Sequence, residues 1–212
     1  MDPNSGKKGM FNKLSKNQGM KLLGKEGFKR KTVSFYRYVI LEDLDTLRDK
    51  LYSDWKFLGV LGRVYLANEG INAQVSVPEH NWLAFKENVH SNKYFLEIPF
   101  KLAIQDDGNS FFKLTIKVRK DILADGLSDN EYDVTNVGKH LTAAEWNDAM
   151  ETGATVVDMR NHYESEIGKF KGAICPDVET FKEELPKVKD MLNDKKKENI
   201  LLYCTGGIRC EK

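Results

Sequence analysis

The 212-residue sequence contains no run of eighteen apolar residues, and no apolar segment follows its basic start. These absences exclude a membrane-spanning helix and an ordinary secretory signal, so we expect a soluble, cytoplasmic protein that does not engage a membrane. Only three cysteines are present, Cys175, Cys204 and Cys210. Three cysteines are too few for a disulfide framework, which leaves thiol chemistry, a metal site or plain burial as their roles.

Histidine is also scarce, since the sequence has four in all. His80, His90 and His140 are scattered along the chain without the paired spacing of metal ligands. We therefore expect no metal site, and no motif in the sequence indicates an organic cofactor. The sequence pattern does not predict an oligomeric state.

The net charge of +1 hides an uneven distribution along the chain. Residues 1–32 carry nine Lys and Arg against two acidic residues, a local net charge of +7 that leaves −6 for the remainder. This segment is rich in Gly, Asn, Ser and Lys and has little apolar periodicity, so we expect a mobile basic arm. Both a nucleic-acid-binding tail and a solubilising leader fit that composition.

Residues 33–123 show a regular order of strand and helix patterns. Alternating and 3.6-residue periodicities predict, in order, a strand over 33–40, a helix over 44–58 capped by Asp43, strands over 63–66 and 71–77, a helix opened by Pro78, and a strand over 100–104. This βαββαβ order is that of the ferredoxin-like sandwich, so we expect an α+β domain of that type.

One extra strand follows, with the sequence FKLTIKVRK over 112–120. Alternation places Leu114, Ile116 and Val118 on one face and basic residues on the other. Such a row of cations can follow a phosphate backbone, and it can equally be the solvated face of a strand. The candidate contacts to a nucleic-acid backbone are Lys113, Lys117, Arg119 and Lys120.

A polar stretch over 124–137 has the composition of an interdomain linker, and it precedes a second domain over 138–212. Thr142 and Glu145 form the sequence pattern of a capping box that opens a helix. The segments ATVVDMR and ILLYC are short apolar strands that end in polar residues, as strands do at the carboxyl edge of a parallel sheet. The second domain is thus predicted to be α/β.

Cys204 comes directly after the second of these strands and is followed by Thr205, Gly206, Gly207, Ile208 and Arg209. Successive backbone N–H groups in a glycine-containing loop can surround an anion. Together with Arg209 they would lower the pKa of the Cys204 thiol and raise its nucleophilicity at neutral pH, and they could also hold a persulfide sulfur. The alternative is an inert, buried thiol at the end of a strand.

CTGGIR resembles the six-residue active loop of rhodanese domains, with Cys204 at the persulfide position. The segment VVDMRNHYESEIGKFKGAI resembles the rhodanese segment with Asp-x-Arg and a downstream Glu, and it departs from that pattern at Lys169, where many rhodaneses have His. The matching positions are Asp158, Arg160, Glu164, Gly168, Gly172 and Ala173. We expect the first three of them to support the loop.

The combination of ANEGINAQ, KVRK, MRNHYE and YCTGGIRCEK resembles the bacterial tRNA uridine 5-hydroxylases of the TrhO type, from about Val33 to Lys212. The resemblance implies an oxidoreductase that uses molecular oxygen as co-substrate to form 5-hydroxyuridine at the wobble position of tRNA. It also implies that the loop cysteine is required. Two other classes stay open, namely a sulfurtransferase that carries a cysteine persulfide and a non-catalytic RNA-binding or sulfur-relay adaptor.

Three further candidates remain, namely Cys210, Cys175 and His162. Cys210 could resolve an oxidised Cys204 or could fill the first turn of a helix. Cys175 is predicted to be a core thiol. His162 lies at the same strand edge as Asp158 and Arg160, where a role in holding that turn is expected.

The predicted second domain has 75 residues, whereas an α/β domain of this kind usually needs on the order of 100 or more. We therefore expect a truncated rhodanese-like domain that is incomplete at its C-terminus. Without a full helix after the active loop, we also expect Cys204 to keep a more ordinary pKa.

Overall fold

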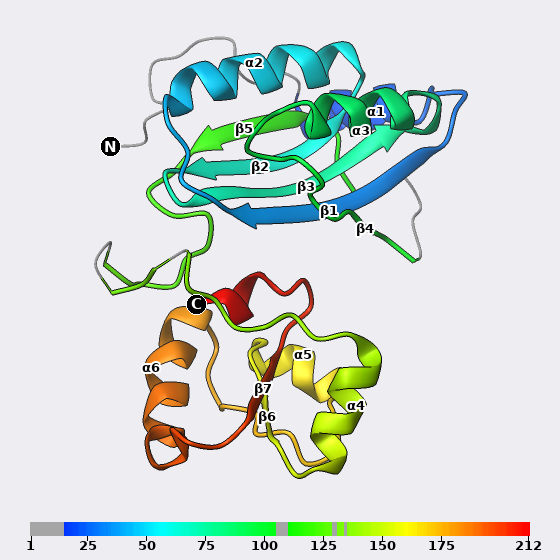
Figure 1. The fold of residues 1–212 in the computed structure, drawn as a ribbon. Helices are drawn as coiled ribbons and strands as arrows, with labels where there is room; N and C mark the ends of the chain where they lie inside the picture. Colours follow the sequence, from blue (N-terminus) through cyan, green and yellow to red (C-terminus); the bar gives the residue numbers. More distant parts are fainter. Residues whose placement is uncertain (1–14, 105–109, 129–130, 134) are drawn as a thin grey trace. The chain divides into compact units, whose positions relative to one another are not determined.

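The computed structural model describes residues 15–104, 110–128, 131–133 and 135–212 (Figure 1). The chain divides into two compact units, Met1–Ile122 and Leu123–Lys212, which are described separately. Within the described residues, no helix is both long and apolar enough to cross a membrane.

The first unit contains one five-stranded sheet with helices packed on one of its faces (Figure 1). In chain order its elements are α1 (Lys16–Leu23), β1 (Arg30–Tyr38), α2 (Leu44–Phe57), β2 (Leu61–Ala67), β3 (Gly70–Pro78), the 3₁₀ turn η1 (Glu79–Asn81), α3 (Trp82–His90), β4 (Lys101–Leu102) and β5 (Leu114–Val118). The strand order is β4-β1-β3-β2-β5. The βαββαβ order predicted from the sequence is confirmed, although β4 is shorter than expected.

Local sequence explains where these elements begin and end. The Asp43 carboxylate accepts a hydrogen bond from the Thr46 N–H at 3.4 Å and so caps α2 as predicted. A two-residue turn joins β2 to β3, and Gly70 directly after it has φ +146°. Its Cα lies so close to the Arg37 carbonyl on β1 that a side chain would collide with that oxygen.

The core of the first unit lies between the sheet and helices α2 and α3. Trp55 from α2 and Phe85 from α3 are fully buried, and both rings pack on Phe35 of β1. The alternation predicted for β5 is confirmed, because Leu114 and Ile116 are buried in this core while Thr115 and Lys117 point to the other face. The basic side chains of β5 therefore lie on the face of the sheet away from α2 and α3.

The expectation of a mobile arm over residues 1–32 is wrong for residues 15–32. Ser15 and Gln18 form a reciprocal capping box that starts α1, and Leu23 at its end is 8 % exposed. Gly19 lies directly against the Phe112 side chain, which ties α1 to the segment before β5. Residues 1–14 of the predicted arm lie outside the described residues.

The second unit has helices around two parallel strands (Figure 1). Its elements are α4 (Ala143–Glu151), β6 (Thr155–Asp158), α5 (His162–Ile167), α6 (Phe181–Met191), the 3₁₀ turn η2 (Asn193–Lys195), β7 (Ile200–Tyr203) and the 3₁₀ turn η3 (Ile208–Glu211). The capping box predicted for Thr142 and Glu145 is present. Because β6 and β7 are parallel, Asp158 and Tyr203 lie side by side at their carboxyl ends.

The predicted linker over 124–137 is not a free connection at its start. Asp125 is buried, and its carboxylate pairs with the Lys212 ammonium at 2.8 Å. Gly126, at φ +79°, lies against the aliphatic stem of Lys182 on α6. Residues from Leu123 onward are therefore part of the second unit.

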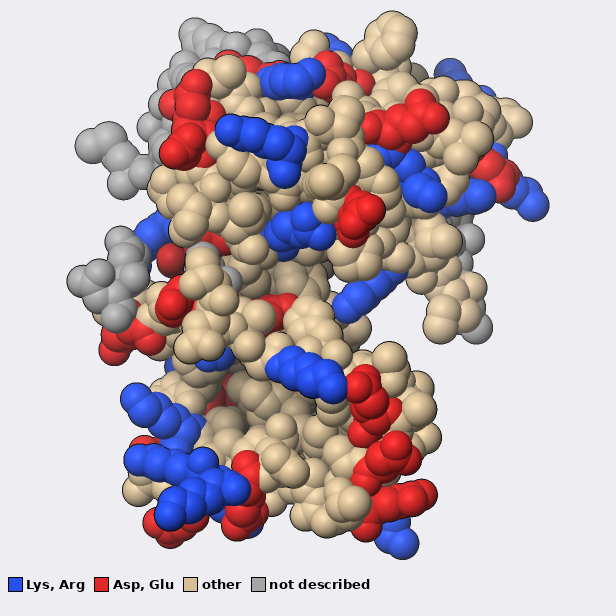
Figure 2. Space-filling view, in the orientation of Figure 1, with Lys and Arg blue, Asp and Glu red and all other residues tan. Residues whose placement is uncertain are grey.

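Figure 2 shows that in this view Lys and Arg gather near the end of α6, whereas Asp and Glu border α4.

Candidate functional site

Cys204 lies where the sequence predicts, directly beyond the carboxyl end of β7. The neighbouring strand β6 ends beside it, and the Met159 N–H donates to the Tyr203 carbonyl at 2.9 Å. The loop then turns back through Gly207, whose φ of +88° is a left-handed conformation, into the short η3 turn. Parallel pairing and this turn bring polar groups from both strand ends toward the thiol.

The Cys204 sulfur is surrounded by hydrogen-bond donors. The Gly207 N–H points at Sγ, with an N–S distance of 3.0 Å. A hydrogen bond from the Cys210 thiol outweighs the desolvation caused by burial and, with the N–H groups of Arg209 and Gly206, lowers the pKa of Cys204 to about 5. The site therefore holds a thiolate at neutral pH.

The expectation that Cys204 keeps an ordinary pKa without a full following helix is wrong. The donors come from the loop itself and from Cys210 on the one-turn η3 segment, so a long helix dipole is not needed. The same hydrogen bond, together with burial, raises the pKa of Cys210 well above its usual value. The two thiols thus form one unequal pair, with Cys204 as the ionised member.

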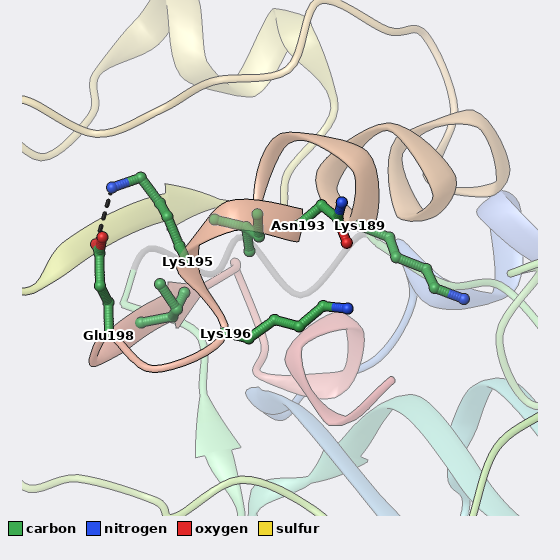
Figure 3. A pocket seen from close by; sticks show the side chains of 7 residues that line it. Lys189, Asn193, Lys195, Lys196 and Glu198 are labelled. Atoms are coloured by element: carbon green, nitrogen blue, oxygen red, sulfur yellow. Dashed lines mark hydrogen bonds and ion pairs between the residues drawn. The ribbon is translucent and has the colours of Figure 1, made fainter.

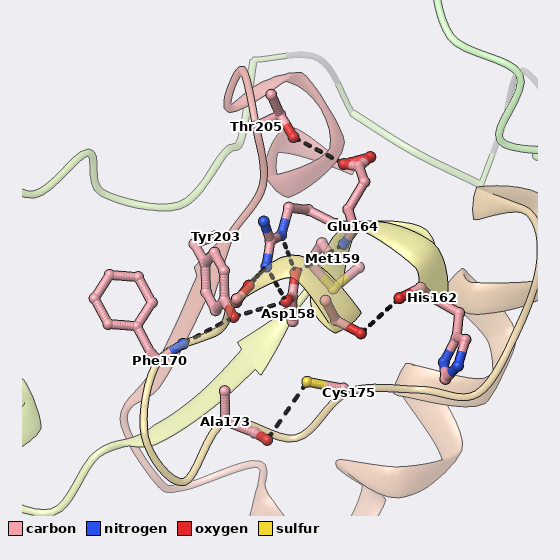
Figure 4. Close-up of polar contacts among 12 residues, drawn as sticks. Asp158, Met159, His162, Glu164, Phe170, Ala173, Cys175, Tyr203 and Thr205 are labelled. Atoms are coloured by element: carbon pink, nitrogen blue, oxygen red, sulfur yellow. Dashed lines mark hydrogen bonds and ion pairs between the residues drawn. The ribbon is translucent and has the colours of Figure 1, made fainter.

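Glu164 on α5 holds the loop from the opposite side (Figure 4). Its carboxylate accepts hydrogen bonds from Arg209 Nη2 at 2.8 and 3.0 Å and from the Thr205 hydroxyl at 2.8 Å. Arg209 also donates to the Met159 carbonyl at 3.2 Å, so its guanidinium is fixed between two elements. Glu164 therefore clamps both ends of the segment that surrounds Cys204.

A second polar network lies at the end of β6 (Figure 4). Arg160 donates to both carboxylate oxygens of Asp158 at 2.8 Å and to the Gly168 carbonyl at 2.6 Å. The Tyr203 hydroxyl donates to Asp158 at 2.7 Å. Burial raises the pKa of Asp158, but these hydrogen bonds outweigh it and lower the pKa overall. The network fixes the loop between β6 and α5, as expected for Asp158 and Arg160.

Two residues take positions other than those predicted. Cys175 is only partly buried, and its thiol contacts the Ala173 carbonyl at 3.6 Å rather than joining the apolar core (Figure 4). The His162 ring lies 3.3 Å from Glu166 and 3.5 Å from Asp177 and points away from Asp158 (Figure 4).

Two residues at the site were missed by sequence reasoning. Tyr203 ends the apolar run ILLY, and nothing in that pattern marks its hydroxyl as a site group. Glu184 on α6 is fully buried, and neither carboxylate oxygen has a hydrogen-bond partner in the structure. Desolvation raises the pKa of Glu184 to about 8, and the charges of Asp158 and Cys204 add to this while that of Arg209 opposes it. The available signal was helical spacing, since Glu184 shares the buried stripe of α6 with Phe181 and Val188.

The remaining candidates lie in the first unit. Lys113, Lys117 and Arg119 lie on or beside the outward face of β5, and Lys120 follows directly. The structure therefore places them in a different unit from Cys204. Thr205 to Arg209 and Cys210 form the loop around the thiol and Glu164 binds that loop, whereas Asp158 and Arg160 form the neighbouring network at the end of β6.

A separate hollow of about 300 Å³ lies at the amino end of β7, at the other end of the strand from Cys204. Figure 3 shows the Lys195 amine turned toward Glu198, to which it is paired at 2.8 Å, and the Lys189 and Lys196 amines pointing away. Its lysines thus lie outside the thiol site. In the described parts of the chain, no group of three or more His, Cys, Asp or Glu is arranged to hold a metal ion.

Comparison with known proteins supplies a family context for this site. Residues 30–122 match the family model described as the UPF0176 acylphosphatase like domain. A solved structure of the BLUF protein BlrB in its dark state aligns with 44 % of this chain and 75 % of its own, at 11 % identity and a TM-score of 0.34.

Curated relatives match a much larger share of the chain. A protein of Leptospira interrogans serogroup Icterohaemorrhagiae serovar Lai (strain 56601) is 57 % identical over 91 % of this chain and 53 % of its own length. A protein of Yersinia pestis (strain Pestoides F) is 46 % identical over 96 % of this chain and 58 % of its own. Both are named tRNA uridine(34) hydroxylase. By sequence, the chain is a homologue of the proteins of that name, and it spans about half of their length.

Proposed function

We propose that the protein is a cytoplasmic oxidoreductase that hydroxylates the wobble uridine of tRNA at C5, with molecular oxygen as co-substrate. Homology to proteins named tRNA uridine(34) hydroxylase, over nearly the whole chain, supports the reaction and the substrate. The residue assignment rests on one observation, which is the Gly207 N–H donating to the Cys204 sulfur at 3.0 Å, in a loop whose further N–H groups and Cys210 thiol lower the pKa of Cys204.

The thiolate has a chemically sensible use in this reaction. Addition of Cys204 to C6 of the uracil ring makes C5 electron-rich, and C5 is the atom that must react with oxygen. Inserting one oxygen atom at C5 leaves the other as water and consumes two electrons and two protons. The C5 hydroperoxide passes its outer oxygen to the Cys210 thiol as a sulfenic acid, and loss of the C5 proton then breaks the C6–S bond and frees Cys204. Cys204 displaces water from the sulfenic acid and closes the disulfide, so the pair supplies the two electrons and, because Cys204 starts as a thiolate, one proton, while solvent supplies the other. A small dithiol must then reduce the disulfide to begin another turnover.

We also propose that the second unit is a rhodanese-like domain. The support is the pair of parallel strands, the reactive cysteine loop directly after β7, and the Asp158–Arg160 pair that fixes the facing loop. In this interpretation a fold associated with persulfide chemistry holds a cysteine used for hydroxylation. A sulfurtransferase that carries a persulfide on Cys204 remains the alternative, because the same donors can hold a terminal sulfur.

The proposed contacts to the tRNA backbone are on the first unit. Lys113 and Lys117 alternate with buried residues of β5, so their ammonium groups are free to meet phosphates on the outward face. Arg119 and Lys120 continue the basic row past the end of the strand.

Mass spectrometry of tRNA nucleosides distinguishes the two functions. Cells that lack the protein are expected to lose 5-hydroxyuridine and to keep their thiolated nucleosides. Re-expression of the protein should restore 5-hydroxyuridine, and an atmosphere of ¹⁸O₂ should place the label on C5. Loss of thiolated nucleosides with unchanged 5-hydroxyuridine would establish the sulfurtransferase instead.

A further inference from the structure

The outward face of the first unit's sheet contains a groove of about 390 Å³. We call it the β2–β5 groove; its lining residues are Gly62, Arg63 and Tyr65 of β2, residues 110–113, and Thr115 and Lys117 of β5. All of them belong to the first unit, and Arg63, Tyr65, Thr115 and Lys117 alternate with core residues. The groove therefore lies on the face of the sheet opposite α2 and α3.

The described residues that line this groove carry charge of one sign. Arg63, Lys113 and Lys117 line it, and its described lining includes no carboxylate. In the described parts of the chain, none of these three cations is paired with an acidic side chain within ion-pair distance. Cations gathered in one groove attract an anionic ligand, and their spacing along two adjacent strands suits consecutive phosphates.

The same groove contains aromatic rings. Tyr65 lies directly beside Lys117 in the parallel register of β2 and β5, and the Arg119 guanidinium lies 5.8 Å from the centre of its ring. Phe111 and Phe112 line the groove at its other end, where Phe112 is held against Gly19 of α1. Aromatic faces next to cations are the combination that binds an unpaired base together with its phosphates.

We propose that the β2–β5 groove binds an unpaired nucleotide of the RNA substrate, with its base stacked on Tyr65 and its flanking phosphates at Arg63, Lys113 and Lys117. The volume is in the range of small-ligand sites, of roughly 300 Å³ or more. A duplex keeps its bases stacked on each other, so it can meet the cations but not the Tyr65 ring. This inference rests on the proposed tRNA substrate and assigns a single-stranded part of it to the first unit.

Binding of fluorescent RNA to the full chain, followed by anisotropy, tests the proposal. The probes are a uridine-rich single strand and the same strand annealed to its complement. Tyr65→Ala is expected to weaken single-strand binding between roughly 5-fold and 150-fold, the range for removing one base stack, and to leave duplex binding unchanged. Tyr65→Phe keeps the ring and should bind as the parent does. A 5-iodouridine probe should photocrosslink to Tyr65 in the parent protein. The crosslink reports where the base lies in the groove even if the alanine variant is unstable.

Charge reversal tests the phosphate contacts. Lys113→Glu with Lys117→Glu should weaken single-strand binding and lower its salt-dependence slope by roughly 0.7 for each phosphate that the variant no longer neutralises. The matched control is Lys189→Glu with Lys196→Glu, the same change of charge at the hollow in the second unit, and it should bind as the parent does. The proposal is overturned if Tyr65→Ala binds the single strand normally, or if the control loses as much affinity as the groove variant.

The failure of this inference is separable from failure of the proposed function. RNA binding is measured without turnover, so it reports on the groove even if no 5-hydroxyuridine forms. Conversely, every groove variant could bind RNA normally while 5-hydroxyuridine still forms in a Cys204-dependent way. That result would reject the proposed RNA site in the groove and leave the proposed hydroxylase function standing.

Discussion

Arg209 and Glu164, which are 45 residues apart in the sequence, form a two-bond ion pair, in which Nη2 donates to both carboxylate oxygens at 2.8 and 3.0 Å. The pair connects α5 to the loop that surrounds Cys204. The same carboxylate accepts from Thr205 at the start of that loop. The position of the donors around the thiol therefore depends on one side chain from another element.

Glu164→Gln tests this clamp. The amide loses the charge that fixes Arg209 and can accept from only one side, so the loop should loosen and the Cys204 pKa should rise. The measurement is the pH dependence of Cys204 alkylation by iodoacetamide. Glu166→Gln, an exposed residue of the same helix, is the control and should leave the profile unchanged. An unaltered profile in Glu164→Gln would show that the loop holds itself.

The Cys204 thiol should react far below the pH at which ordinary cysteines react. With a pKa of about 5, roughly nine-tenths of it is ionised at pH 6, against less than about 1 % of an unperturbed cysteine. Cys210→Ala removes the largest stabilising donor and should move the alkylation midpoint upward by a unit or more, in the range of roughly 1–3 units that one strong donor supplies. Cys175→Ser is the matched control. A midpoint near 8.5 in the parent protein would contradict the donor arrangement.

Glu184 should make stability fall as pH rises. Its folded pKa of about 8 is above its ordinary value, so its proton is bound more tightly in the folded state. The stabilisation that this bound proton adds to the free energy of unfolding is complete below about pH 4.5. It is lost as pH rises toward 8, with a slope of at most about 1.4 kcal/mol per pH unit. Glu184→Gln cannot ionise. Urea unfolding at pH 5 and pH 8 should therefore show that the free energy of unfolding of the variant, relative to that of the parent, is higher at pH 8 than at pH 5. The same difference between variant and parent at both pH values would exclude this role.

The Tyr203 hydroxyl is expected to matter for stability more than for chemistry. Burial and its hydrogen bond to Asp158 raise the pKa of Tyr203 to about 12, so it stays a neutral donor throughout the physiological range. Tyr203→Phe leaves a buried carboxylate with one donor fewer and should cost about 1–3 kcal/mol of unfolding free energy. Thermal unfolding measures the cost, and alkylation of Cys204 should be unaffected.

The sequence predicted the first unit well because its strands alternate cleanly and Asp43 caps its first long helix. Helix α1 was missed because it lies in a segment rich in Lys, Gly, Asn and Ser, although Ser15 and Gln18 form a visible capping box. The length of strand β4 was overestimated, because an apolar stretch indicates burial but not for how many residues the strand stays paired with its neighbour. Residues 124–128, the start of the predicted linker, looked like a free connection because nothing local shows that Asp125 meets Lys212.

The site was predicted only in part, for similar reasons. Cys204, its loop and the supporting residues Asp158, Arg160 and Glu164 could be found because motif spacing marks them. The contact between Cys204 and Cys210 depends on the one-turn η3 segment, whose geometry spacing alone does not give. Glu184 belongs to no motif, and only the fold shows that its carboxylate is buried without a hydrogen-bond partner.

The central claim is that the Cys204 thiolate carries out the hydroxylation of tRNA uridine. The most direct measurement is the 5-hydroxyuridine content of tRNA from cells that lack the protein and express either the parent or Cys204→Ser. The exchange is nearly isosteric and removes only the soft nucleophile. We predict that the parent restores 5-hydroxyuridine and that Cys204→Ser, present at equal abundance, restores less than about 1 % of it, a loss within the range for removing a nucleophile. Full restoration by Cys204→Ser would contradict the account.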